Sequence, residues 1–162
     1  MSHFPKLFKN STWIVPRDTL KAYLIGGGSV KSVRDQTVWI IDSYSDGYIF
    51  GTAYLSIDGV PFSQTKIIGS ITPCLDVALS FYNDTTITSG SGKFMRDNGK
   101  WKFLMQMNTL SNSQTNNSTS TETSTGGISH WSYMLRVKPT DPNYRHLPGV
   151  GLSVPEYIRQ FN

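Results

Sequence analysis

Apolar and polar residues alternate with a period of two over most of residues 30–139, which is the pattern of half-buried β-strands. The segment 48–57 alternates throughout, with Leu55 and Ile57 on one of its two faces. Asp58-Gly59 and Asn98-Gly99 interrupt the alternation, and both dipeptides are strong signals for hairpin turns. The pattern therefore predicts a series of strands joined mostly by short turns.

We expect strands at 12–15, 36–42, 48–57, 60–71, 75–82, 85–96, 100–109 and 129–138. Strands that follow one another through short turns form an antiparallel up-and-down meander. A sandwich and a closed barrel can both bury its apolar face, but only closure removes the sheet edges. The sequence thus predicts an all-β fold, a calycin-like barrel of roughly eight strands, in a single domain over 1–162.

The remaining segments lack the two-residue period. Leu20, Tyr23 and Leu24 follow helical spacing and Gly26 is a suitable stop, so we expect a short helix over 16–25. A second short helix is expected in the C-terminal extension 140–162, because Ser153 and Glu156 have the spacing of a capping box. Residues 1–11 are predicted to be an N-terminal arm. Residues 111–127 carry no apolar side chain and are predicted to be a flexible Ser/Thr/Asn-rich loop.

Composition and charge exclude several classes of protein. A chain of 162 residues with 12% aromatic residues and a net charge of +4 can form one well-packed domain. Its basic residues are scattered along the sequence, so no nucleic-acid partner is expected. No apolar run is long enough to span a membrane. The single Cys74 and the lack of a leader-like apolar stretch favour a cytoplasmic location, with secretion left open.

The apolar face of the predicted strands is rich in aromatic side chains and methionine. These residues can fill a barrel core, or they can line a lumen that accommodates a small ligand. For a ligand-binding lumen we expect apolar walls and two polar contacts, from Gln106 and His130. The expected wall residues are Trp39, Phe81, Trp101, Met105, Trp131 and Tyr133. His130 is expected opposite the apolar face of its strand, at the rim.

A family resemblance supports the barrel. The segments 76–90 and 92–105, with Asp97-Asn98-Gly99 and Trp101, resemble the central hairpins of avidin-like members of the calycin superfamily. The resemblance covers about residues 36–110 and implies an eight-stranded meander barrel that binds a small, largely apolar ligand at one open end. Strand 75–82 lacks the tryptophan of the biotin-binding relatives, and the lipocalin Gly-x-Trp signature is absent before Trp13. The resemblance therefore implies the fold but not biotin.

The sequence predicts neither a metal site nor a cofactor site. The three histidines lie far apart, and no CxxC or GxSxG occurs. The main hypothesis is a protein that binds an apolar or amphipathic small molecule in the barrel lumen. A second hypothesis is a small barrel enzyme of the isomerase or cyclase type, which would need an ionisable residue in the lumen. A homo-oligomer formed through the stripe Tyr48, Phe50 and Tyr54 is a third hypothesis, and a carbohydrate-binding module is a fourth.

Overall fold

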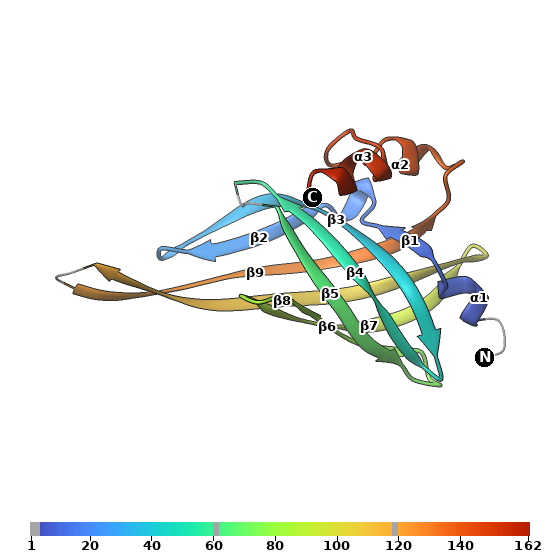
Figure 1. The fold of residues 1–162 in the computed structure, drawn as a ribbon, viewed down its shortest axis with the longest axis horizontal. Helices are drawn as coiled ribbons and strands as arrows, with labels where there is room; N and C mark the ends of the chain where they lie inside the picture. Colours follow the sequence, from blue (N-terminus) through green and yellow to red (C-terminus); the bar gives the residue numbers. More distant parts are fainter. Residues whose placement is uncertain (1–3, 60–61, 118–119) are drawn as a thin grey trace.

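The structure is a computed structural model that describes residues 4–59, 62–117 and 120–162, with side chains outside 110–125. Nine strands form one antiparallel sheet that closes on itself (Figure 1). The strands are β1 (Ser11–Ile14), β2 (Lys21–Gly26), β3 (Ser29–Ser45), β4 (Tyr48–Ile57), β5 (Ser63–Ile71), β6 (Asp76–Tyr82), β7 (Ile87–Asp97), β8 (Lys100–Asn117) and β9 (Ser120–Val137). The helices are α1 (Phe4–Phe8), α2 (Pro142–Arg145) and α3 (Val154–Arg159), with a 3-10 turn at Arg17–Thr19. The predicted antiparallel barrel with short helices near the termini is confirmed.

Closure of the barrel depends on two short strands that share one position in the wall. β1 pairs with both β3 and β9, and β2 pairs with the same two strands farther along. Nine strands thus fill eight positions in the barrel. The segment between β1 and β2 contains the 3-10 turn, so the predicted helix over 16–25 is wrong. Its apolar spacing belongs to a strand, in which Ala22 is buried and Tyr23 is exposed.

Aromatic side chains fill one end of the barrel. Residues 4–8, predicted to belong to an N-terminal arm, form α1, which covers this end, and Phe8 is fully buried. The Phe8 ring lies 5.2 Å from the rings of Tyr44 and Phe94 and 6.0 Å from that of Phe103. We call this end the closed end. Aromatic pairs at these distances add to the burial energy, so α1 is a firmly packed plug.

The opposite end carries the hairpins β2–β3 and β8–β9, which project beyond the barrel in Figure 1. β8 and β9 pair continuously to Asn117 and Ser120. The prediction of a loop over 111–127 is therefore wrong for residues 111–117 and 120–127, whose backbones pair with each other as a ribbon. A ribbon that leaves the barrel has no core face to bury, so hydrophobic alternation does not mark it in the sequence.

The C-terminal extension packs on the outside of the barrel, above β1 and β3 (Figure 1). The predicted capping box is confirmed, because the Ser153 side chain and the Glu156 backbone N–H interact as expected. The Tyr157 hydroxyl donates to the Gln36 carbonyl at 2.6 Å. The outer faces of β1 and β3 are thus apolar here because the chain covers them itself.

Close approach of β7 and β8 requires a glycine at position 92. A Cβ built on Gly92 would lie 1.9 Å from the Leu104 carbonyl oxygen, whereas one on Gly26 would meet nothing within 4 Å. We expect Gly92→Ala to reduce the free energy of unfolding by at least about 2 kcal/mol, as overpacking does. Gly26→Ala should change it by less than about 0.5 kcal/mol. Urea unfolding of both variants measures the difference, and equal effects would contradict the packing argument.

Candidate functional site

A cavity of about 300 Å³ opens at the end of the barrel opposite α1. We call it the mouth cavity. The β2–β3 and β6–β7 connections lie at this end, as do the end of β4 and the start of β5. Its apolar lining comes from Leu24, Ile25, Leu55, Ile57, Met107 and Ile128. Its polar lining comes from Asp35, Ser63, Thr65, Thr86, Thr88, Thr109 and His130.

Strand register places these side chains inside. Met107 lies directly opposite His130, and Ala53 lies opposite Thr65. Directly opposed residues of antiparallel strands project to the same face of the sheet. Because Met107 and Ala53 are buried on the inner face, His130 and Thr65 point inward with them. The Thr88 and Thr109 hydroxyls, on the neighbouring strands β7 and β8, form a short hydrogen bond with each other.

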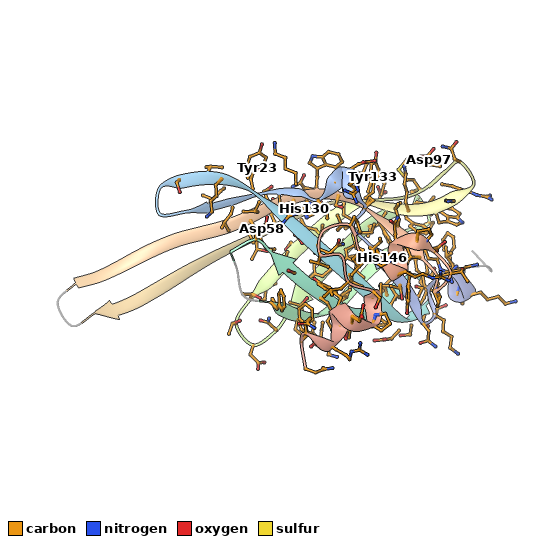
Figure 2. All side chains as sticks on the ribbon, turned by 90° about the horizontal axis from the view of Figure 1, so that it is seen from above. Tyr23, Asp58, Asp97, His130, Tyr133 and His146 are labelled. Atoms are coloured by element: carbon orange, nitrogen blue, oxygen red, sulfur yellow. The ribbon has the colours of Figure 1, made fainter. Side chains whose placement is uncertain are left out.

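His130 and Asp35 form a buried ion pair at this cavity. They are 2% and 4% exposed, and His130 Nδ1 lies 2.9 Å from Asp35 Oδ2. The other ring nitrogen, Nε2, lies 2.6 Å from the Thr19 carbonyl oxygen. The second Asp35 oxygen accepts a 2.6 Å hydrogen bond from the Thr37 hydroxyl. Figure 2 shows His130 in the body of the barrel, near the base of the projecting hairpins.

The partners of His130 determine its protonation state. Burial disfavours the charged ring, but the hydrogen bond and charge of Asp35, with the Thr19 carbonyl, outweigh it and raise the pKa of His130. Both partners are hydrogen-bond acceptors, so the imidazolium, which carries a proton on each nitrogen, satisfies both of them. Such a ring has neither a lone pair for a general base nor a free N–H for a substrate. In this arrangement both ring nitrogens of His130 are engaged by groups of the protein itself.

Two other buried polar groups lack partners. Among the described residues, Thr65 Oγ1 and Trp39 Nε1 make no hydrogen bond although both atoms are fully buried. Trp39 lies opposite Ala53, and Ala53 lies opposite Thr65, so both residues belong to one row of the inner face. A buried polar group without a partner costs about 1–3 kcal/mol. Thr65 lines the mouth cavity, so rotation about its χ1 bond would bring the hydroxyl to a molecule bound there.

The predicted wall residues separate into two groups. Trp39, Phe81 and Met105 are buried in the barrel core, as expected for inward-facing residues, and Trp101 packs against this core at the closed end. None of these four lines the mouth cavity. Trp131 is 54% exposed, so its predicted inward orientation is wrong.

Tyr133 and Gln106 also lie on the outer face. The Lys102 ammonium lies over the Tyr133 ring, 4.1 Å from its centroid. The Gln106 side-chain amide donates to the Ser129 hydroxyl at 3.1 Å. Among the predicted site residues, His130 is therefore the one that lines the cavity. Its predicted place at the rim is corrected to a buried position on the inner face.

The error on β9 has a physical cause. Trp131, Tyr133, Leu135 and Val137 alternate as a core face would, but Val137 packs against the C-terminal extension on the outside. The inner face of β9 instead carries Ile128, His130, Ser132 and Met134. Alternation identifies two faces without saying which one is inside. The pairing of His130 with Met107, which is on the inner face of β8 as predicted, is the signal that separates the two faces of β9.

The lining residues that the sequence did not reveal are mainly threonines and Asp35. Threonine is common on both faces of strands, so its presence does not indicate a cavity. Leu55 and Ile57 were assigned to a face of their own strand, and this face is the inner one. Asp35 lies just before the predicted strand 36–42, because β3 begins earlier, at Ser29.

Comparisons with known proteins give no relative. No protein-family model, curated protein or solved structure matches this chain. In the part of the chain that the structure describes, no cluster of three or more His, Cys, Asp or Glu side chains is placed to hold a metal ion. No helix among these residues has the length and hydropathy needed to cross a membrane.

The raised pKa of His130 predicts a pH-dependent stability. Protonated His130 contributes stability that is complete below the unfolded-state pKa, near 6.5, and is lost as the pH rises through the higher folded-state pKa. The loss should be about 1.4 kcal/mol for each unit between the two pKa values. Urea unfolding between pH 5 and pH 9 would measure it.

The control for this prediction is the exposed His146. His146→Gln should keep the dependence, whereas His130→Gln should remove it and destabilise the protein by about 3 kcal/mol at acidic pH, as the loss of a buried ion-pair partner does. A difference between wild type and His130→Gln that stays constant from pH 5 to pH 9 would contradict the assignment.

Proposed function

We propose that this protein binds a small, uncharged amphipathic molecule in the mouth cavity. The observation that carries the proposal is the buried, unpartnered hydroxyl of Thr65 in the cavity wall. Buried polar groups in folded proteins nearly always have a partner, so an exception inside a cavity suggests an external one. A ligand oxygen that accepts from or donates to this hydroxyl would remove the cost of burying it.

The chemistry of the lining supports an uncharged ligand. The ionisable side chains that line the cavity are Asp35 and His130, whose opposite charges compensate each other. The remaining polar side chains of the lining are hydroxyls. A carboxylate or ammonium group entering this site would lose its hydration without gaining a counter-ion. An alcohol, ketone or lactone with an apolar body meets both kinds of surface.

The size of the cavity and the hydrogen bonds of its ionisable residues favour binding over catalysis. About 300 Å³ is near the lower end of the range for small-molecule sites, so the ligand is small. The enzyme hypothesis requires an ionisable group in the lumen, and His130 is one. Because both of its ring nitrogens and both Asp35 oxygens are engaged within the protein, binding is the function that this geometry supports better. The resemblance to avidin-like calycins remains a prediction that agrees with this proposal.

The oligomer hypothesis depends on an aromatic stripe on the outer face of β4. Tyr48 and Phe50 are exposed. Tyr54 instead packs against Phe161 at 5.2 Å, so the chain covers part of the stripe itself. This contact reduces the area available to a second copy and weakens the hypothesis.

Native mass spectrometry of the purified protein should show a small molecule that is absent from the denatured mass. Competition with the neutral fluorophore N-phenyl-1-naphthylamine then tests whether the site prefers uncharged ligands. We expect octanol to displace this probe at least about tenfold more effectively than octanoate, because octanoate enters without a counter-ion. Equal competition by the two compounds would contradict the uncharged class. No binding of the fluorophore at all would contradict a ligand-binding lumen.

A second prediction concerns the hydroxyl itself. Thr65→Val retains the shape of the side chain but removes the unpartnered hydroxyl. We expect the unfolding free energy to rise by about 1 kcal/mol and the affinity for octanol to fall about tenfold. Thr52→Val is the matched control, because Thr52 is a buried threonine on the outer face of the sheet and should leave octanol affinity unchanged. Unchanged affinity in Thr65→Val would remove this residue from the site.

A further inference from the structure

A groove runs across the outside of the closed end, far from the mouth cavity. It consists of two adjoining cavities, of about 540 Å³ and 650 Å³, that share Leu7, Trp101 and Arg136. We call it the basic groove. Helix α1 provides Leu7, β8 provides Trp101 and β9 provides Arg136.

The floor of the groove is apolar and firmly held. Trp101 stacks on Phe94 with ring centroids 4.7 Å apart and planes 5° apart. Phe4 of α1 meets the same tryptophan edge-on at 5.6 Å. Trp101 remains half-buried rather than covered, so part of its surface is available in the groove. A rigid, partly exposed tryptophan is the kind of side chain that dominates binding energy at protein interfaces.

The rim of the groove is positively charged. Lys6 and Arg96 line one cavity, Lys100 and Lys138 line the other, and Arg136 lines both. Among the described residues, none of these five cations forms an ion pair, in contrast to Lys102 and Lys93, which pair with nearby aspartates. Asp141 is the one described acidic residue in the lining, and its carboxylate accepts the backbone N–H of Lys138 at 2.6 Å.

We propose that the basic groove binds an acidic segment of a partner polypeptide, with one apolar or aromatic residue on Trp101 and carboxylates on both sides. An arginine and a tryptophan at the centre with cations around them is complementary to such a segment in charge and in polarity. The groove is distinct from the mouth cavity, so this proposal does not depend on the proposed function.

A polynucleotide is the less favoured anion. Nucleic-acid surfaces combine a longer basic track with several aromatic rings on which successive bases stack. The groove offers the half-buried rings of Trp101 and Phe4, which meet edge-on, between two short cationic flanks. Inorganic phosphate would satisfy the charges but leave the apolar floor uncovered.

The test is fluorescence anisotropy of a dye-labelled peptide, Glu-Glu-Phe-Glu-Glu, titrated with the full chain. We expect saturable binding that weakens between about 10 mM and 150 mM ionic strength, because added salt screens the charges. A peptide with Gln in place of each Glu should bind at least about tenfold more weakly. Amide shifts of ¹⁵N-labelled protein should move at Leu7, Trp101 and Arg136.

Charge reversal supplies the controls. Arg136→Glu should weaken peptide binding at least about tenfold. The exposed Lys6→Glu should weaken it too, which covers the outcome that Arg136→Glu fails to fold. Lys31→Glu changes the net charge by the same amount at the mouth end and should alter binding less than about twofold.

Three results would overturn the proposal. The first is equal weakening in Lys6→Glu and Lys31→Glu, which would mean attraction by net charge alone. The second is the absence of saturable binding, and the third is tighter binding of a single-stranded RNA of equal charge or of inorganic phosphate. Thr65→Val should bind the peptide normally, so a failure of the lumen hypothesis is distinguishable from a failure here.

Discussion

The structure depends on how the barrel wall closes across the interruption between β1 and β2. Residues 15–20, between β1 and β2, leave the hydrogen-bonded sheet. Their buried backbone groups must therefore find other hydrogen-bond partners. Side chains supply several of them. The Gln36 amide donates to the Val15 carbonyl, and His130 donates to the Thr19 carbonyl. The Thr19 and Ser132 hydroxyls add a 2.9 Å hydrogen bond between this segment and β9.

This mode of closure has a direct consequence for the lumen. The His130 ring that completes this part of the wall is buried, and Asp35 is its charge partner inside the lumen. The ionisable groups of the cavity are thus engaged within the protein, and the remaining polar side chains of its lining are hydroxyls. The completed wall and the proposed preference for an uncharged ligand therefore depend on the same pair of residues. A mutation of the ion pair would alter both the fold and the site, whereas a change at Thr65 would alter mainly the site.

The two ends of the barrel differ in chemistry. At one end α1 and its aromatic partners exclude water, and the cations lie outside, around Trp101. At the other end the interior is open and uncharged overall. This separation lets one small domain present two independent surfaces. The basic residues that form the groove are widely spaced in the sequence, and the fold brings Lys6, Arg96 and Arg136 together at one end of the barrel.

Local patterns determined the all-β class, the two faces of β4 and β8, the turn at Asn98-Gly99 and the C-terminal capping box, because each depends on residues close together in the chain. Tertiary structure decided what local patterns leave open. The second half of the apparent helix over 16–25 is instead part of β2, because β3 and β9 provide ladder partners on both sides. The inner face of β9 was decided by register, since a period of two is the same on either face. The cavity and the groove combine residues from distant strands, so only closure of the barrel could reveal them.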